Sequence, residues 1–576
     1  MTLTPWLLSL TVLLSAPIRK IELLGFHYLT PSQVQHILGI KEGQEYYEPL
    51  LRGGLAKLRE LYRSKGFHHF EVIGQEVKTT DQGIELRIVV REGPRAVVEK
   101  ITFEGIESLD PRDWEPLVQK YPTPRPYDEA EWTDLQNALL RLYAEQGRPF
   151  AEVAYSADSV RPDTYQVHFR IQEGPKVIIA KVKVSGLRSV RKKIVLRELK
   201  FHPPAVYQES KVLESIRGIY LTGLFSAVTR ELVPLNEAGD SIVLVLHCTE
   251  IKPRYLELGV GYRLPSELEI RISAGHLNLF NNNQRLEVTG NLLIHPTAAQ
   301  PDQKIVRRRA EIEYAEPYFL GFPLRALAKP FYEKDLLVQK EEYGLSLELQ
   351  KIFTPYFSLT WALQWKRSPI RSDSSGPISN SIIFLPLYDS RDNLFDPTHG
   401  AFLSLRLQQA GWILGGDNYF RRIFFDYSQF IPLRRRTVLA FRLRVGSQSP
   451  FGPSTSIPAT ERYYLGGEGS IRGYDERSIG PLDPNTPDLH SGNHLLNFNV
   501  EVRYRWNHWG AAVFVDGGGL AETWAEAKTM KIYVSTGVGI RYFTLIGPIR
   551  LDWGYKLVDR SPGDRGRFYL GLGHMF

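Results

Sequence analysis

From about residue 253 to the C-terminus, apolar and polar residues alternate in segments roughly ten residues long. In residues 499–506 the apolar face carries Val500, Val502, Tyr504 and Trp506, and the polar face carries Asn499, Glu501, Arg503 and Arg505. A period of two predicts β-strands. Residues 404–409, 440–448 and 567–576 repeat the pattern, and no helical segment accompanies them to cover an apolar face. We count sixteen such segments in residues 253–576, which predicts an all-β, 16-stranded transmembrane β-barrel.

The predicted connections alternate in length. Those after strands 2, 4, 6, 12 and 14 are short, and those after strands 3, 7, 13 and 15 are longer. Short periplasmic turns and longer outer loops are typical of outer-membrane barrels. The longest connection, residues 447 to about 495, follows strand 11 and should therefore enter from the outside. The link after strand 1, near residue 265, departs from the pattern because it is short.

The first 250 residues contain an α+β module repeated three times. Each copy opens with a strand that ends in glycine, at Gly25, Gly105 and Gly186, which lie 80 and 81 residues apart. A helical stretch in each copy ends at a second glycine, at Gly66, Gly147 and Gly223. Residues 84–94 and 165–175 are alternating strands that end in Glu-Gly-Pro, and residues 242–250 are a more variable version. The alternative is three unrelated α+β domains that share these glycine and strand positions by chance. We predict modules at 18–95, 96–176 and 177–252, followed by the barrel at 253–576.

Composition and the N-terminal apolar run narrow the possible classes of protein. The 576 residues are 43% hydrophobic and 23% charged, which is ordinary for a folded protein. The apolar run at residues 6–16 is shorter than the roughly 18 residues that a spanning helix needs. We interpret residues 1–17 as a signal peptide, with an uncleaved or misassigned start as the alternative. Cys248 is the single cysteine, so no internal disulfide forms. The net charge of +7 is interpreted as scattered surface lysines rather than attraction to anionic lipid.

The most informative motif is an arginine between glycines in the longest connection. Arg472 follows Gly466, Gly467 and Gly469 and precedes Gly473. Strand 13 supplies Phe514, Asp516 and Gly518. A guanidinium enclosed in a barrel needs a carboxylate, so we predict a bidentate pair between Arg472 and Asp516 that pins the loop in the lumen. Glu501 is a second candidate partner. Phe514 shares a face with Asp516 and is therefore predicted to lie in the lumen beside the loop. The alternative is an Arg472 solvated in an outer loop.

The last ten residues are predicted to close the barrel. Phe576 ends an alternating strand whose apolar face carries Phe568, Leu570 and Leu572. The alternative is a frayed terminus. Gly571 and Gly573 either weaken this strand or make room for crowded lumen side chains, and the sequence does not separate the two.

Enzymatic motifs are absent from the sequence. It contains no His-Glu-x-x-His, no Gly-x-Ser-x-Gly and no phosphate-binding Gly-x-x-x-x-Gly-Lys-Ser/Thr, so we predict no enzymatic activity, metal site or cofactor. The arginine runs at 307–309 and 434–436 resemble a nucleic-acid patch. Each lies at a strand end, where lumen charge or headgroup contact is the better interpretation, so no nucleic-acid partner is predicted.

These residues resemble the outer-membrane assembly and secretion family of BamA, TamA and the two-partner secretion transporters. The family's loop motif matches Ile471, Arg472, Gly473 and Tyr474, and its Phe-x-Asp-x-Gly motif matches Phe514, Asp516 and Gly518. Residues 388–405 also resemble the turn between strands 8 and 9, and residues 539–557 the penultimate hairpin. The resemblance implies periplasmic polypeptide-transport-associated (POTRA) domains joined to a 16-stranded barrel. Three copies without a plugging helix are most similar to TamA.

The resemblance also implies a function without covalent catalysis. POTRA edge strands would accept unfolded outer-membrane proteins or autotransporters, and the seam between residues 255–263 and 567–576 would loosen for a client strand or for bilayer thinning. The implied partners are these clients, the lipid bilayer and an inner-membrane-anchored TamB-like protein. The implied location is the outer membrane with POTRA domains in the periplasm. The alternative is a two-partner-type pore that exports one dedicated secreted protein.

Overall fold

The computed structural model describes residues 17–263, 267–294, 305–336, 340–369, 376–483, 486–544, 547–560 and 563–576. The predicted signal peptide, apart from Pro17, lies outside these residues. Pro17 pairs with Glu45, and its carbonyl accepts a hydrogen bond from the amide of Ile84 at 2.9 Å. Pro17 therefore already contacts the first module, and the signal peptide at residues 1–17 stays a prediction.

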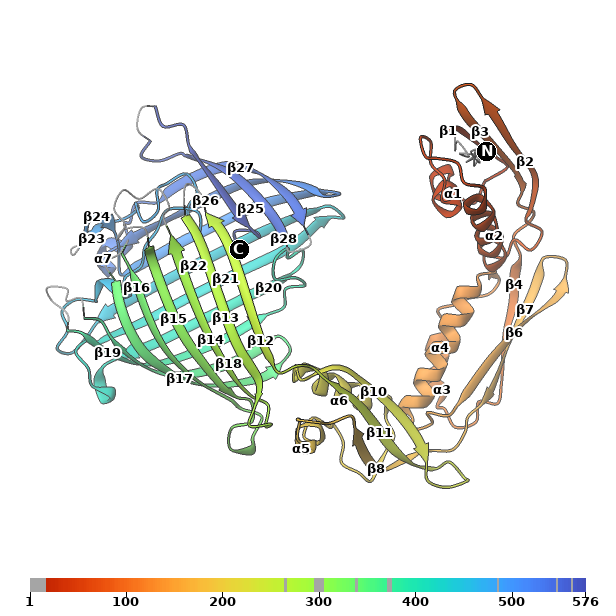
Figure 1. Ribbon diagram of the computed structural model, residues 1–576, viewed down its shortest axis with the longest axis horizontal. Coiled ribbons are helices and arrows are strands. Elements are labelled where there is room, and N and C mark those ends of the chain that lie inside the picture. Colours follow the sequence, from red (N-terminus) through yellow and green to blue (C-terminus); the bar gives the residue numbers. More distant parts are fainter. Residues whose placement is uncertain are drawn as a thin grey trace, which may run out of the picture. The chain divides into compact units, whose positions relative to one another are not determined.

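Three α+β modules precede the barrel (Figure 1). The first comprises β1 (Ile18–Leu24), α1 (Pro31–Leu38), α2 (Glu48–Ser64), β2 (Glu71–Thr80) and β3 (Gly83–Arg91). The second comprises β4 (Val97–Glu104), α3 (Pro111–Val118), β5 (Arg125–Pro126), α4 (Glu129–Glu145), β6 (Glu152–Arg161) and β7 (Thr164–Gln172). The third comprises β8 (Ile178–Ser185), α5 (Lys192–Leu196), β9 (Ala205–Val206), α6 (Glu209–Leu221), β10 (Phe225–Pro234) and β11 (Ser241–Glu250). In each module the first strand runs parallel to the last, which leaves β2, β6 and β10 as edge strands.

A helical apolar stripe builds the core of each of the first two modules. In α2 the buried side chains are Leu51, Leu55, Leu58 and Tyr62, and in α4 they are Trp132, Leu135, Leu139 and Tyr143. Spacings of three and four residues put each set on one face of its helix. These faces pack against the central strands β3 and β7, where Ile88 and Phe169 are buried. The repeat in the sequence therefore corresponds to a repeated packing unit.

A carboxylate at the end of each module binds backbone amides, which explains why glutamate recurs there. Glu92 accepts hydrogen bonds from the amides of His27 and Tyr28, and Glu173 accepts them from Glu107 and Ser108. Glu250 does the same for Arg188, Ser189 and Val190. Each glutamate thus ties the loop after the first strand to the end of the last strand. Burial opposes the charged form, but the bonds from Ser108, Glu107 and Tyr143 prevail and lower the pKa of Glu173 to about 2.

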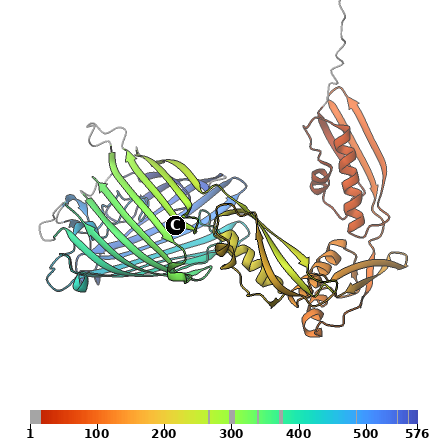
Figure 2. The same ribbon diagram turned by 60° about the horizontal axis from the view of Figure 1, so that its bottom comes forward.

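The rest of the chain forms one 16-stranded antiparallel sheet that curls into a barrel (Figures 1 and 2), which confirms the predicted strand number. Its first eight strands are β12 (Arg254–Arg263), β13 (Glu267–Leu279), β14 (Gln284–Ile294), β15 (Ile305–Glu316), β16 (Arg325–Asp335), β17 (Lys340–Thr354), β18 (Phe357–Arg367) and β19 (Ile378–Asp389). The next eight are β20 (Gly400–Ala410), β21 (Phe420–Arg434), β22 (Thr437–Pro450), β25 (His494–Trp506), β26 (Trp509–Ala521), β27 (Tyr533–Thr544), β28 (Gly547–Lys556) and β29 (Arg567–Leu572). Each strand pairs with its neighbours in chain order.

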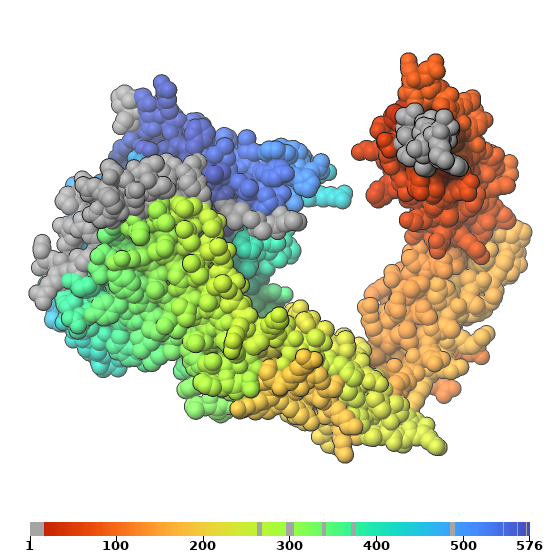
Figure 3. Space-filling view, in the orientation of Figure 1, coloured from red at the N-terminus to blue at the C-terminus, as the bar shows by residue number. Residues whose placement is uncertain are grey.

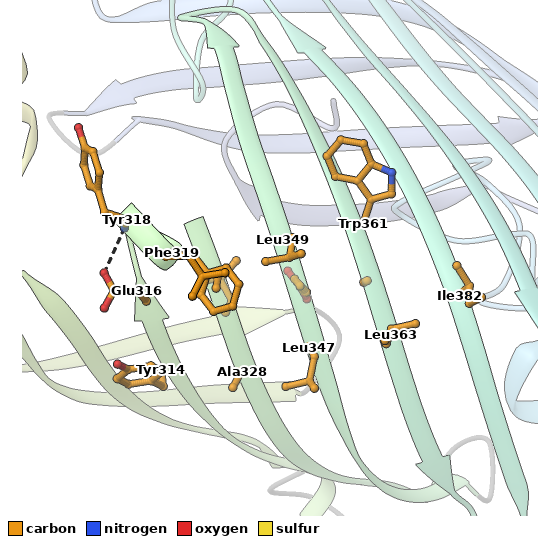
Figure 4. A pocket seen from close by; sticks show the side chains of 15 residues that line it. Tyr314, Glu316, Tyr318, Phe319, Ala328, Leu347, Leu349, Trp361, Leu363 and Ile382 are labelled. Carbon is orange, nitrogen blue, oxygen red and sulfur yellow. Dashed lines mark hydrogen bonds between the residues drawn. The ribbon is translucent and has the colours of Figure 1, made fainter. Parts of the chain in front are cut away.

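Apolar side chains cover the outer face of this sheet. Leu347, Leu349, Trp361, Leu363 and Ile382 are exposed there, and Figure 4 shows them projecting from β17 to β19. The small side chain of Ala328, paired with Tyr314 and Leu347, leaves an apolar hollow in this face. Figure 3 shows the outer face of β12 to β16 as a continuous surface. None of the helices in the described part of the chain has the length and apolar character needed to cross a bilayer.

Most connections follow the predicted lengths. Short turns of two to four residues follow β13, β17, β21, β25 and β27, at the end of the barrel where residue 254 begins the first strand. The connection after β15 was also predicted to be short but has eight residues, and the one after β19 has ten. The longest connection runs from residue 451 to 493, between β22 and β25, and contains β23 (Leu482–Asp483) and β24 (Thr486–His490). It begins at the opposite end of the barrel. A short helix, α7 (Trp524–Ala527), lies in the connection after β26.

The closing strand is shorter than predicted. β29 ends at Leu572, because Gly573 adopts a φ of 82° and turns the chain out of the extended conformation. Phe576 therefore does not end the strand, and its ring lies 6.3 Å from that of the buried Phe430 and near Arg503. Phe568 does project outward, with 65% of its surface exposed. The side chain of Leu572 lies outside the described residues.

Candidate functional site

Arg472 is fully buried in the barrel lumen and is held by three carboxylates. Its Nε donates to Oδ2 of Asp516 at 2.8 Å and its Nη2 to Oδ1 at 3.0 Å, which is the bidentate geometry expected from the sequence. Its Nη1 lies 2.9 Å from Oε2 of Glu501 and 2.9 Å from Oδ2 of Asp552. The structure thus brings Arg472, Asp516 and Glu501 together and adds Asp552, which sequence reasoning missed.

Phe514 provides the floor of this pocket. Its ring is buried in the lumen, and Cζ of Arg472 lies 3.3 Å from the ring centroid. A guanidinium stacked on an aromatic face gains a cation–π attraction, which is larger where water is excluded. The aromatic residue and the carboxylate come from the same face of β26, as the Phe-x-Asp spacing requires.

Charges balance within the buried cluster. Arg541 donates to Asp552 and Glu501, Arg503 donates to Glu501, and Arg550 donates to Asp552 and Glu468. Four guanidiniums (Arg472, Arg503, Arg541 and Arg550) therefore meet four carboxylates (Glu468, Glu501, Asp516 and Asp552). Buried charges are tolerated when each is paired and hydrogen-bonded, whereas removing one partner is costly. This network fixes the position of the loop inside the barrel.

Glycines allow the loop to approach the wall closely. Gly473 has a φ of +96°, and a Cβ there would lie 3.1 Å from the carbonyl carbon of Gly554 on β28. A Cβ on Gly518 would lie 2.3 Å from the carbonyl oxygen of Leu496 on the neighbouring strand. A contact below 3 Å, as at Gly518, requires atoms to shift, and at Gly473 a tight contact adds to a φ that L side chains rarely adopt. Side chains at these positions would therefore separate the strands or displace the loop.

Apolar packing secures both sides of Arg472. Ile471 and Tyr474 are buried in a cluster with Leu465, Ile479 and Leu520. The hydroxyl of Tyr474 also lies 2.6 Å from the carbonyl oxygen of Val558, within hydrogen-bond distance. The predicted loop residues 471–474 thus all contact the barrel interior.

The loop also contacts the closing strand. The hydroxyl of Tyr569 on β29 accepts a hydrogen bond from the amide of Gly473 and donates to the carbonyl of Tyr474, both at 2.9 Å. Arg567 on the same strand pairs with Asp475 at 2.6 Å. Sequence reasoning considered the apolar side of β29 and missed these residues. Strand alternation was the available signal, because it places Tyr569 on the lumen side whenever Phe568 faces lipid.

Alternation would also have identified the missed members of the charge cluster. Arg550, Asp552 and Gly554 occupy every second position of β28, so they share one face. On that face Asp552 can meet Arg541, which lies on the lumen side of the paired strand β27. The triplet at 307–309 is likewise engaged in the wall, since Arg307 and Arg309 both bind the buried Glu333.

A family model for the Omp85 superfamily domain matches residues 278–576, which is more than half of the chain. The chain belongs to the Omp85 superfamily. A POTRA model, described as a surface antigen variable number repeat, matches residues 16–93 and 96–174. This Omp85 protein therefore has an outer-membrane barrel and periplasmic POTRA domains.

This Omp85 protein is similar to two proteins named BamA. It is 25% identical over 596 residues to the outer membrane protein assembly factor BamA of Nitratidesulfovibrio vulgaris, covering 97% of this chain and 73% of the relative. It is 22% identical over 647 residues to BamA of Neisseria meningitidis serogroup B, covering 98% and 78%. The crystal structure of Haemophilus ducreyi BamA lacking POTRA domains 1–3 matches with a TM-score of 0.66 at 18% identity, covering 83% of this chain and 99% of that one. The structural match supports the fold alone.

The two ends of the Omp85 barrel sheet meet at β12 and β29. They lie beside each other, yet no hydrogen-bonded ladder joins them among the described residues. β12 is ten residues long and β29 six, so much of the edge of β12 has no partner strand. A Cβ on Gly571 would lie 2.6 Å from Oε1 of Glu468, which favours accommodation of lumen side chains as the reason for this glycine.

Proposed function

We propose that this protein is an outer-membrane protein assembly factor that receives unfolded clients through its POTRA domains and aids their insertion at the seam between β12 and β29. The observation that carries the proposal is the seam itself. An open edge presents unpaired backbone N–H and C=O groups, which can template an incoming strand. Leu256, Leu258 and Val260 on β12 are each about seventy per cent exposed, at 74%, 70% and 68%, so this edge is also apolar toward lipid.

The POTRA edges fit the first step of this function. β2, β6 and β10 each pair on one side only. An extended client can add to such an edge through main-chain hydrogen bonds, which demand little of its sequence. On β2 the side chains of Ile73 and Val77 are exposed and can contact apolar client residues. This mode suits unfolded outer-membrane proteins and needs no catalytic residue.

The names of the two BamA relatives support assembly as the function. The likeness to TamA rests on the number of POTRA copies, so the TamB-like partner stays a prediction. Crosslinking in cells followed by purification would test it, since a TamB-like protein should then be recovered with this chain.

Site-specific photocrosslinking tests the seam. A photoreactive residue at Val260 on β12 should capture nascent barrel proteins, whereas the same residue at Val538 on β27 should not. Val538 is a matched control because it is also exposed on the outer face, at 53%, but lies on a strand paired on both sides. Equal capture at both positions would reject the seam. Capture of one secreted protein in place of barrel clients would favour the dedicated exporter.

A further inference from the structure

The apolar hollow on the outer face of the barrel wall is large enough to hold part of a ligand. Its volume is about 650 Å³, within the range of roughly 300–1,000 Å³ that is typical of small-molecule sites. Two alanines of β16, Ala326 and Ala328, line it together with larger side chains of β15, β17, β18 and β19 (Figure 4). Ala328 begins a row of paired residues that continues through Leu347, Leu363 and Ile382. Small side chains beside large ones therefore create the space.

The turn after β15 forms one side of the hollow. It contains a short 3₁₀-helix, η2 (Phe319–Gly321). Phe319 and Leu320 line the hollow, and they are 36% and 79% exposed. Burying such apolar surface is favourable, whereas leaving it in water is not. These side chains are therefore suited to contact with hydrocarbon.

Aromatic side chains on the same face give the level of the hollow in the membrane. The turn after β15 lies at the end of the barrel where residue 254 follows the POTRA domains, which is the periplasmic end. Trp361 lines the hollow and alternates in step with Leu363, and Tyr388 alternates in step with Ile382, so both rings project outward near this end. Tryptophan and tyrosine girdles mark the level of lipid headgroups on barrels. The hollow therefore lies beside the periplasmic leaflet.

A lysine lies at the periplasmic edge of the hollow. Lys351 follows Leu349 by two positions on β17, so its side chain leaves the outer face of the wall as well. Its Nζ donates to the carbonyl oxygen of Pro323, in the turn after β15, at 3.3 Å. Long lysine side chains reach along apolar surface and keep the ammonium group at the polar interface. The ammonium of Lys351 is thus placed beside the turn that borders the hollow.

The two carboxylates that line the hollow already have partners. Glu348 faces the lumen and pairs there with Lys329 at 3.1 Å. Glu316 accepts hydrogen bonds from the amide of Tyr318 at 3.1 Å and from the side chain of Gln284 at 2.6 Å. In the described part of the chain, no carboxylate lies within ion-pair distance of the lysine at the edge. That lysine can therefore receive an anionic group.

We propose that the hollow binds an acyl chain of a phospholipid of the periplasmic leaflet, and that Lys351 binds its phosphate. A hydrocarbon chain matches the apolar lining, and an ammonium group is a common binding partner of phosphate. Both contacts lie on one face of the wall, so a single lipid molecule can make them together. Bound lipid would fill the space beside Ala328 and hold the turn after β15 at a fixed depth. This inference concerns lipid and stands whether or not clients insert at the seam.

Native mass spectrometry of the purified full-length protein tests the acyl-chain contact, with phosphatidylglycerol as the probe. Ala328→Trp fills the hollow and should weaken binding at least roughly tenfold, because excluding even a few methylene groups has an effect of this size. The control Ala274→Trp adds the same side chain at an exposed outer-face alanine of β13, outside the hollow, and should bind normally. Heat-dependent migration on gels verifies that both variants are folded. Equal binding by both tryptophan variants would overturn the proposal.

A second pair of variants tests the phosphate contact. Lys351→Gln should weaken binding of phosphatidylglycerol by about fivefold, whereas Lys351→Arg should retain it, because one positive charge at the interface is worth about that much. Diacylglycerol, which has the chains but no phosphate, should bind the unaltered protein as weakly as phosphatidylglycerol binds Lys351→Gln. Unchanged binding by Lys351→Gln would contradict the assigned role of this lysine.

Photocrosslinking in cells distinguishes lipid from a protein partner. A photoreactive residue at Leu347, which lines the hollow and is 40% exposed, should give adducts with phospholipid. A protein adduct as the main product would overturn the proposal and identify the hollow as an interface with a partner.

Discussion

The Arg472→Ala substitution should release the loop from the barrel lumen. It leaves Asp516 without either guanidinium bond, so that its carboxylate keeps only neutral donors, the backbone amide of residue 472 at 3.1 Å and the side-chain amide of Asn499 at 2.9 Å. Glu501 and Asp552 keep Arg503, Arg541 and Arg550 as partners. The cost is therefore concentrated on one buried carboxylate.

Removing one partner from a buried ion pair typically costs about 3 to 5 kcal/mol. The lost stacking on Phe514 adds to this, since a desolvated cation–π contact is worth about 2 kcal/mol. A change of about 3 kcal/mol alters an equilibrium at least roughly 150-fold. Because this energy holds the loop rather than the strand ladders, the barrel should still assemble while the loop leaves the lumen more often.

Trypsin added to intact cells measures this opening at Arg477, which lies in the same loop. The Arg472→Ala protein should be cleaved there much faster than the unaltered protein. Arg560→Ala removes an exposed arginine and serves as the control, with no expected change. Arg472→Lys should lie between the two, because an ammonium keeps the charge but cannot form the bidentate bonds. Trypsin resistance equal to that of the unaltered protein would refute the pinned loop.

Other substitutions test separate parts of the structure. Gly473→Ala should loosen the loop by about 1 to 3 kcal/mol, because its φ of +96° strains any other residue, whereas Gly469→Ala has open space and should be neutral in the same trypsin assay. Tyr569→Phe should raise the hydrogen-exchange rate of the Gly473 amide, which loses its acceptor, and an unchanged rate would contradict that contact. The pKa of Glu173 is lowered to about 2, so its stabilisation is complete above the usual value of 4.5 and is lost as the pH falls toward 2. Glu173→Gln should therefore flatten the fall in POTRA melting temperature over that range, and an unaltered slope would assign the acid sensitivity to other groups.

The alternating pattern was sufficient to predict the barrel and the two faces of its wall. Glu501 and Arg503 were placed inside, and Val502 and Tyr504 outside, from parity alone. Phe514 was placed correctly in the lumen because it shares its parity with Asp516. These predictions are reliable because side chains alternate between the two faces of a strand, and a shift of the strand by one residue would turn its charged side chains toward lipid.

Contacts that depend on how far the loop enters the barrel could not be predicted from the sequence. Asp552 meets Arg472 because the loop descends to the level where β28 carries its carboxylate, and that depth is set by packing rather than by local sequence. Tyr569 was missed for the same reason. The end of β29 was misplaced because Gly573 fits a strand pattern yet takes a positive φ. The module boundaries at 18–95, 96–176 and 177–252 remain predictions from the repeat.

The decisive measurement is depletion of this protein in its source cells, with quantification of outer-membrane and secreted proteins together. Insertion of clients at the seam predicts that the amounts of several integral barrel proteins fall, while the secreted proteins in the medium are unchanged. Loss of one secreted protein from cells with normal outer membranes would contradict it and establish a dedicated exporter.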